Sequence, residues 1–185
     1  MLRNVPPGWM NAYSPHPASG ESQPTTVPTA YPKAGPTRMI GLLMLLNSHK
    51  GSEDVALLAE DLDLEVDGVL PSLESAEVLQ LIKVAGGKAS LTELGERLVR
   101  GTIRERKAIV RDQLKRTTLF RTLLRALEKA PNQCLSDKEL SHIVAFSTAA
   151  DEAVPSIVNW GRYANLFRYD ADRRRLVMVR RSPAV

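Results

Sequence analysis

A seven-residue pattern that occurs twice constrains the fold of this chain more than any other feature. DGVLPSL at 67–73 and DEAVPSI at 151–157 both follow D-x-x-Φ-P-S-Φ, where Φ is an aliphatic residue. Each copy leads into a short run with the composition of a β-strand, at 81–84 and at 166–169. Because internal repeats reflect repeated structural units, we expect two versions of one unit in which a helix is followed by a β-hairpin.

The residues around the first copy have the pattern of three helices. Residues 39–46 are apolar nearly all round, which is typical of a buried helix. Ser52 is a suitable N-cap for a second helix, and Asp67 is a suitable N-cap for a third. Pro71 then falls in the first turn of the third helix, where a missing N–H is tolerated.

A β-hairpin and a further helix are expected next. Residues 81–84 and 88–90 have the composition of two strands, and Gly86-Gly87 between them can adopt the positive φ angles of a tight turn. SLTE at 90–93 is a capping-box sequence, which predicts that a helix follows. Three helices and a hairpin are the outline of a winged helix-turn-helix.

The second half of the chain repeats this outline after a long helical region. Residues 102–130 have helical apolar spacing, with a polar interruption at 115–118 and a stop at Pro131. SDKE at 136–139 is a second capping box, and Asp151 is a suitable N-cap for the helix that holds the second copy of the repeat. The expected strands of the second hairpin are residues 166–170 and 175–179.

The expected fold class is mainly α (α+β), with winged helix-turn-helix units in tandem. Residues 1–35 are rich in Pro, Ser, Thr and Gly, so they cannot bury enough surface to offset the entropy lost on ordering, and we expect a disordered tail. An acidic first unit over 36–100, a linker helix over 101–116 and a basic second unit over 117–181 complete the expected organisation.

The net charge of +4 combines two halves of opposite sign. Residues 36–100 carry 6 basic and 11 acidic side chains, a net charge of −5, whereas residues 101–185 carry 17 basic and 9 acidic, a net charge of +8. A basic half can attract nucleic acid or an acidic protein surface. The preferred interpretation is that these charges are solvated or that the two halves compensate each other.

Catalytic and metal-binding motifs are absent from the sequence. Gly87-Lys88 lacks the leading glycine and the following Ser or Thr of a phosphate-binding loop. The three histidines (His16, His49 and His142) and the one cysteine, Cys134, are too scattered for a zinc site, which needs clustered ligands. We therefore expect a protein that is not an enzyme, without catalytic residues, metal or cofactor.

The residues that we expect to contact a partner lie in the second unit. In the first unit the third helix carries acidic residues and no basic one, so phosphate would repel it. In the second unit, Trp160 and Phe167 have the spacing of core residues, whereas the tyrosines and arginines around them are side chains favoured at interfaces. Arginines on an exposed hairpin can equally serve to protect its edge. The candidate partner-binding residues are Arg162, Tyr163, Arg168, Tyr169, Arg173, Arg174 and Arg175.

Several segments together resemble the AAA-associated C-terminal domain, which follows the ATPase of nitrate/sulfonate/bicarbonate-type ABC transporters. The similarity covers about residues 38–179. The segments that carry it are MIGLLMLL at 39–46, LAEDL at 58–62, LTELG at 91–95, IRERK at 103–107, LFRTLLRAL at 119–127, NWGRYA at 159–164 and LFRYD at 166–170.

The resemblance implies an accessory or regulatory domain that acts beside an ATPase, here without an ATPase in the same sequence. We therefore expect a non-enzymatic module that binds an ABC transporter ATPase or another protein. The alternative is a DNA-binding transcriptional regulator that uses the basic second unit. No apolar run reaches the roughly 18 residues of a membrane span, so we expect no membrane insertion. The expected location is the cytoplasm, or the membrane surface through a transporter complex; the oligomeric state is left open.

Overall fold

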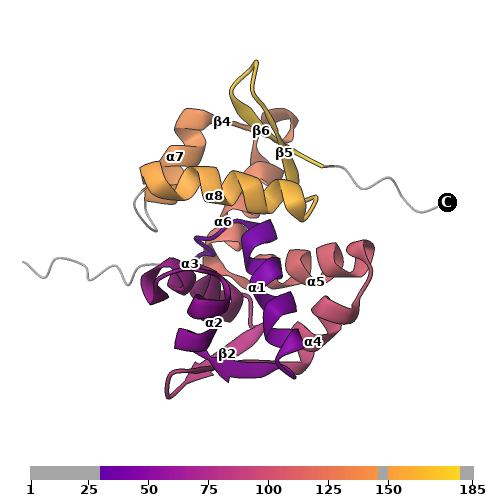
Figure 1. Cartoon of the computed structure of the whole chain (residues 1–185). Coiled ribbons are helices and arrows are strands. Elements are labelled where there is room, and N and C mark those ends of the chain that lie inside the picture. The colour runs from indigo at the N-terminus through magenta and orange to yellow at the C-terminus, as the bar shows by residue number, and fades with distance from the viewer. Residues whose placement is uncertain (1–29, 146–149, 180–185) are drawn as a thin grey trace, which may run out of the picture.

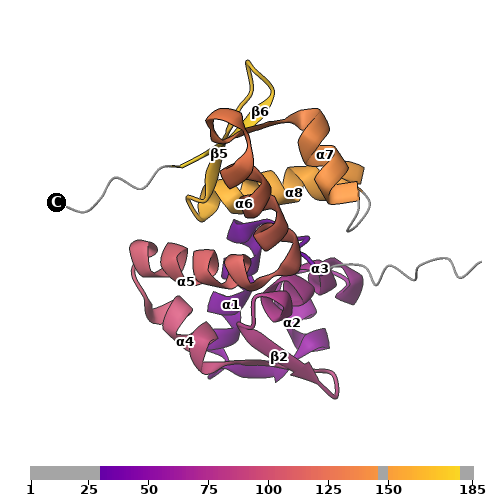
Figure 2. The same cartoon turned by 180° about the vertical axis from the view of Figure 1, so that it is seen from behind.

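The computed structural model describes residues 30–145 and 150–179. Within these residues the chain forms eight α-helices, one short 3-10 helix and two three-stranded antiparallel sheets. Figure 1 shows the two units one above the other, and Figure 2 shows them from behind. The expected fold class, mainly helical α+β with two winged units, is confirmed. For residues 1–29, the prediction of a disordered tail lies outside the described residues.

The first unit has the element order of a winged helix. Its elements are α1 (Pro36–Ser48), β1 (Ser52–Asp54), α2 (Val55–Asp61), α3 (Val66–Val78), β2 (Ile82–Ala85) and β3 (Lys88–Leu91). The sheet order is β1-β3-β2, and Val84 lies opposite Ala89 in the hairpin register. Gly86 and Gly87 have φ angles of 57° and 78°, which glycine adopts without steric cost, so the predicted hairpin turn is confirmed.

The second unit repeats this order of elements. Its elements are α6 (Thr118–Lys129), the 3-10 helix η1 (Pro131–Gln133), β4 (Cys134–Ser136), α7 (Asp137–Ala145), α8 (Ala150–Tyr163), β5 (Phe167–Asp170) and β6 (Arg175–Met178). The sheet order β4-β6-β5 corresponds strand for strand to β1-β3-β2. The two copies of the sequence repeat therefore lie in α3 and α8, the helices that precede the hairpins.

Two helices join the units, α4 (Glu93–Arg100) and α5 (Ile103–Arg116). Thr102 and Glu105 form a capping box that starts α5. The Arg106 guanidinium donates hydrogen bonds to the backbone oxygens of Leu98 and Val99 at 3.1 and 2.8 Å, so it binds carbonyls in the last turn of α4. The predicted interruption of the long helical region is confirmed, because α5 ends at Arg116 and α6 begins at Thr118.

The helix starts expected at Ser52, Asp67 and Ser90 each differ from the observed starts by a few residues. Ser52 lies in β1, and Asp54 caps α2 by accepting a hydrogen bond from the Ala56 N–H at 2.8 Å. Asp67 lies inside the first turn of α3 rather than before it, because that helix begins at Val66.

This earlier start places Pro71 at the sixth position of α3, beyond the first turn. Thr92, not Ser90, caps α4, with its Oγ1 accepting from the Gly95 N–H at 3.0 Å. Ser90 instead lies in β3, where its hydroxyl bonds that of Ser52 at 2.6 Å. Ser52 and Ser90 are paired with each other in the sheet, so neither is available as a helix cap.

In the second unit, the predicted capping box before α7 is confirmed. The Ser136 N–H donates to Glu139 Oε2 at 2.8 Å, and the Glu139 N–H donates to Ser136 Oγ at 3.3 Å. Asp151 follows Ala150, the first described residue of α8, so it lies within that helix rather than before it.

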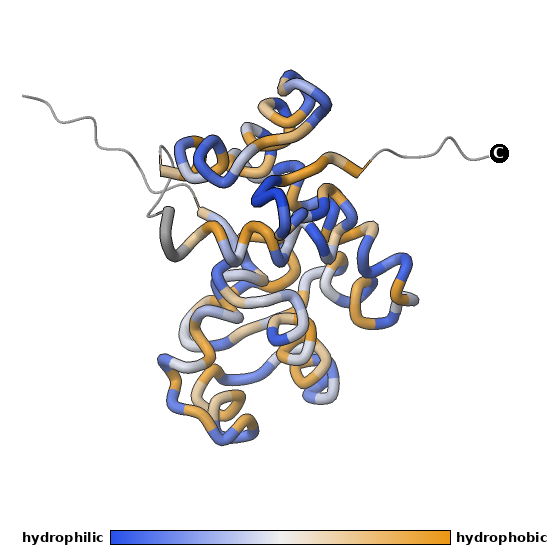
Figure 3. The backbone as a smooth tube through the Cα atoms, turned by 90° about the horizontal axis from the view of Figure 1, so that it is seen from above, coloured by the Kyte–Doolittle hydropathy of each residue, from blue (hydrophilic) through white to orange (hydrophobic). Residues whose placement is uncertain are grey.

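The buried side chains of both units belong to one continuous apolar cluster. Residues of α1 and α3 dominate it in the first unit, while Phe120 and Phe167 stack in the second with ring centroids 6.5 Å apart. Trp160 and Phe167 are buried, as predicted. Apolar and polar residues interleave along the coloured part of the tube (Figure 3). No helix among the described residues is long and apolar enough to span a membrane.

Residues 30–35, here called the strap, were expected in the tail but pack between α3 and α8. Tyr31 and Ala34 are buried. The Ala34 N–H donates to Ser75 Oγ of α3 at 2.9 Å, while the Trp160 indole N–H of α8 donates to the Ala34 oxygen at 2.8 Å. The Ser156 hydroxyl of α8 also donates to the Pro32 oxygen at 2.7 Å. The strap therefore links α3 to α8, the two helices that contain the copies of the repeat.

Candidate partner-binding surfaces

The wing of the second unit is held in place by a carboxylate at the start of α7. The Tyr169 hydroxyl donates to both oxygens of Asp137 at 2.8 and 2.9 Å, and Arg174 Nε donates to Asp137 Oδ2 at 3.0 Å. The hydrogen bond to Asp137 is the main reason why the pKa of the Tyr169 phenol is raised. Two of the seven candidate residues thus contact the molecule's own α7, so they position the hairpin.

The remaining candidate arginines divide into one paired and three unpaired side chains. Arg175 Nε lies 3.4 Å from Asp170 Oδ2 across the hairpin. Arg162, Arg168 and Arg173 are exposed, and they form no ion pair with the described side chains of residues 30–145 and 153–179. These three side chains remain available to an external anion.

Tyr163 lies at the contact between α8 and α5. Its ring is 6.4 Å from the Trp160 ring in an edge-on arrangement, and Lys107 Nζ lies 5.7 Å from the Tyr163 ring centroid. Burial raises the pKa of its phenol, against the charge of Arg106. Tyr163 is half-buried, so much of its ring contacts the protein itself. The seven candidate residues therefore do not converge on one site.

The face of α8 that corresponds to a recognition helix is partly covered. Trp160 is fully buried, and the strap lies along Ser156 and Trp160. A recognition helix has to enter the major groove with its outer face free. The strap therefore occupies part of the surface that groove insertion by α8 would require.

The first unit exposes an apolar and acidic surface around the turn between α2 and α3, here called the α2–α3 surface. Its carboxylates are Glu60, Asp63, Glu65 and Asp67, all exposed. Its exposed aliphatic residues, with 39 to 49% of their surface accessible, are Leu57, Leu62, Leu64, Val66 and Leu70.

Sequence reasoning missed the α2–α3 surface, although residues 61–67 read DLDLEVD, a strict alternation of acidic and aliphatic residues. This alternation could have predicted the surface from the sequence. In a helix-turn-helix this position faces DNA, and here its carboxylates would repel phosphate. The chemistry of this surface suits a protein rather than a nucleic acid.

A basic stripe along α5 was also missed. Arg104, Lys107, Arg111 and Lys115 recur at intervals of three or four residues and so share one face of the helix. No ion pair in the described part of the chain joins a carboxylate of the first unit to a basic residue of the second. The charges of the two halves are therefore not joined by close ion pairs in this part of the chain.

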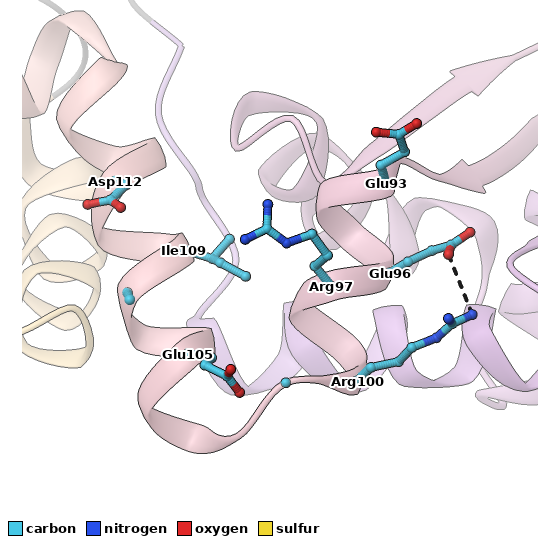
Figure 4. A pocket seen from close by; sticks show the side chains of 9 residues that line it. Glu93, Glu96, Arg97, Arg100, Glu105, Ile109 and Asp112 are labelled. Carbon is cyan, nitrogen blue, oxygen red and sulfur yellow. Dashed lines mark ion pairs between the residues drawn. The ribbon is translucent and has the colours of Figure 1, made fainter.

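An open groove of about 600 Å³ lies between α4 and α5. Figure 4 shows Arg97 reaching from α4 across the groove towards Ile109 of α5, with Glu96 paired to Arg100 at the rim. Four carboxylates line it, those of Glu93, Glu96, Glu105 and Asp112. The Glu105 carboxylate accepts hydrogen bonds from the Thr102 backbone and hydroxyl, which lower its pKa. Glu105 therefore serves as a helix cap.

The described residues contain no group of three or more His, Cys, Asp or Glu side chains arranged to hold a metal ion. Cys134 is partly buried, and its thiol donates to the Asn132 oxygen at 3.3 Å.

One family of known proteins is similar to this chain. The family model described as the C-terminal AAA-associated domain matches residues 56–170, which extends from α2 to the end of β5. Neither the curated proteins nor the solved structures yield a match.

Proposed function

Because the chain belongs to the family of C-terminal AAA-associated domains, we propose that it is a non-enzymatic accessory module that binds and regulates the ATPase of an ABC transporter of the nitrate/sulfonate/bicarbonate type. The observation that carries this proposal is the family match over 115 of 185 residues (56–170), which spans most of both winged units. In this proposal the chain acts by contact with another protein and has no catalytic residues of its own.

The chemistry of the two helices that precede the hairpins supports a protein partner over DNA. The α3 helix carries the carboxylates of Asp67, Glu74 and Glu77, which would repel the phosphates of DNA. Glu74 pairs with Lys33 of the strap at 3.2 Å, and Glu77 accepts a hydrogen bond from the Val84 N–H. In α8, the strap covers the face around Trp160. Neither helix offers a free, basic face to a DNA groove.

The test is a binding titration with the ATPase subunit of a nitrate/sulfonate/bicarbonate-type transporter from the same organism. We expect a saturable complex at about micromolar concentration or below, and a change in the rate at which the subunit hydrolyses ATP. The chain alone should not hydrolyse ATP. No complex and an unchanged hydrolysis rate would remove the proposal.

The alternative, a DNA-binding regulator, is favoured by one observation, the exposed and unpaired side chains of Arg162, Arg168 and Arg173. If these arginines bind phosphate, the affinity for duplex DNA should fall steeply with salt. The combined variant Arg162→Ala, Arg168→Ala and Arg173→Ala should then lose that salt dependence. A weak affinity that is equal in the variant and the wild type would exclude this alternative.

A further inference from the structure

We propose that the α2–α3 surface is the docking site for a basic, amphipathic segment of the partner protein. This inference rests on the proposed function and deepens it, because it assigns the contact to the first unit and specifies the chemistry of what binds there. Three features of the surface carry it: its exposed aliphatic side chains, its unpaired carboxylates and its fixed backbone.

The aliphatic side chains lie close together on the turn and on the first turns of α3. Leu64 packs over α3, because a Cβ placed on Gly68 would lie 3.5 Å from the Leu64 Cβ. Val66 and Leu70 are four residues apart and therefore share a face of the helix. Leu57 of α2 is 49% exposed. A cluster of exposed aliphatic residues with a polar rim is typical of a site for protein association.

The Arg38 guanidinium lies beside this surface, where it donates to the Gly68 oxygen at 2.8 Å, but it is not ion-paired with the carboxylates. In the described part of the chain, Glu60, Asp63, Glu65 and Asp67 form no ion pair. The neighbouring Asp61 differs, since its Oδ2 lies 2.7 Å from His49 Nε2. This surface has four carboxylates without ion pairs, interleaved with aliphatic side chains. Its charge and its apolar surface therefore complement a partner segment that carries both basic and apolar residues.

The backbone of the turn is fixed by hydrogen bonds before any partner binds. The Leu64 N–H donates to the Ala59 oxygen at 2.9 Å and the Asp63 N–H to the Glu60 oxygen at 3.0 Å. With Asp63 at a φ of 52°, these bonds form a Schellman motif that closes α2. A preformed surface loses little conformational entropy on binding. The site therefore does not require the partner to order it.

The test uses two variants with the same number of carboxylates removed. The surface variant combines Asp63→Asn, Glu65→Gln and Asp67→Asn. The control variant combines Glu93→Gln, Glu96→Gln and Asp112→Asn, which lie in the groove between α4 and α5. Circular dichroism and thermal unfolding confirm that both variants fold. A further variant, Leu57→Gln with Leu70→Gln, removes apolar surface without changing charge.

Two probes are titrated against each protein: the ATPase subunit, and a synthetic amphipathic helical peptide of leucine and lysine. We expect the surface variant to bind the ATPase about tenfold more weakly or worse, and the control variant to bind like the wild type. In NMR titrations with the peptide, the methyl signals of Leu62, Leu64 and Leu70 should shift in the wild type and the control. These shifts should be lost in the surface variant.

The outcomes separate this inference from the proposed function. If the ATPase binds the surface variant as tightly as the wild type, the inference is overturned and the proposed function stands. If the ATPase does not bind at all but the peptide selects the α2–α3 surface, the proposed function fails and the surface chemistry is supported. If the peptide shifts no methyl of this surface, the inference is overturned. Salt-sensitive self-association that uses the surface and the basic stripe of α5 also overturns it, since the occupant is then a second copy.

Discussion

The two units share one topology but use the helix before the hairpin differently. Ala76 of α3 and Trp160 of α8 both lie nine residues after the aspartate of their repeat, and both are fully buried. Ala76 is small, and the outer face of α3 around it remains acidic. Trp160 reaches outwards to the strap, where its indole N–H binds the Ala34 oxygen. The strap contacts both helices, but on α3 it meets Glu74 and Ser75 in the C-terminal half. Asp67 and Leu70, near the N-terminus of α3, stay exposed.

The cores differ as much as these helices do. The sequence from 36 to 100 contains no aromatic residue, so these residues contribute only aliphatic side chains and Met39 to the buried cluster. The second unit stacks Phe120 on Phe167 and sets Tyr163 edge-on against Trp160. The same strand order results in both units. The topology is therefore set by the positions of apolar residues and turns, and it accommodates both an aliphatic and an aromatic core.

The largest expected effect comes from removing the anchor of the second unit. Trp160→Ala deletes a fully buried aromatic side chain and should lower the free energy of unfolding by about 3–5 kcal/mol. Trp160→Phe keeps most of the ring but loses the bond to the strap, and should cost less. Urea denaturation measures both variants. Equal losses in the two would show that the hydrogen bond to Ala34, not packing, anchors the helix.

Gly161 next to Trp160 should tolerate no side chain. A Cβ there would lie 2.0 Å from the Phe167 ring, which is stacked on Phe120 and cannot readily move. Gly161→Ala should therefore destabilise the protein by about 1–3 kcal/mol or more. Gly41→Ala is the matched control, since a Cβ there meets nothing within 4 Å and α1 should gain about 0.5–1 kcal/mol. Thermal unfolding that shifts both variants in the same direction would contradict this account.

The serine of the repeat should respond with opposite signs in the two units. Ser156 donates to the strap, so Ser156→Ala should cost about 1 kcal/mol. The Ser72 hydroxyl is buried and has no hydrogen-bond partner within the described residues. Ser72→Ala should therefore be neutral or stabilising by up to about 1 kcal/mol. Chemical denaturation of the two variants checks the difference, and an equal loss in both would refute the contrast between the units.

The smallest expected effect is on the loss of folding stability at low pH. Hydrogen bonds from Ser136 lower the pKa of Glu139, and those from Thr102 lower the pKa of Glu105. A carboxylate with a lowered pKa in the folded state adds stability above its unfolded pKa of about 4.5, and this stability is lost as the pH falls through the folded pKa. Glu105→Gln with Glu139→Gln should lessen the fall of the melting temperature below that pH. Glu93→Gln, the control, should leave the fall unchanged.

Local sequence patterns predicted the elements that depend on neighbouring residues. The capping box of Ser136 and Glu139, the glycine turn at 86–87 and the break before Thr118 all follow from residues within a few positions of one another. The repeat predicted the duplicated unit for the same reason, since one pattern recurs intact.

Long-range contacts account for what the sequence did not reveal. The short strands β1 and β4 were missed because their partners lie far along the chain, as when Ser52 pairs with Ser90. The strap looked like a disordered tail because its stabilising bonds come from Ser75 and Trp160. The role of Asp137 in fixing two candidate interface residues was hidden likewise, 32 and 37 residues away from them.

Hydrogen exchange of the full chain, measured with and without the ATPase subunit, tests most directly whether the first unit docks while the second anchors. The account predicts that the partner slows exchange over residues 57–70 and leaves the β5–β6 hairpin unchanged. Slower exchange confined to that hairpin, or no change anywhere in the chain, would contradict it.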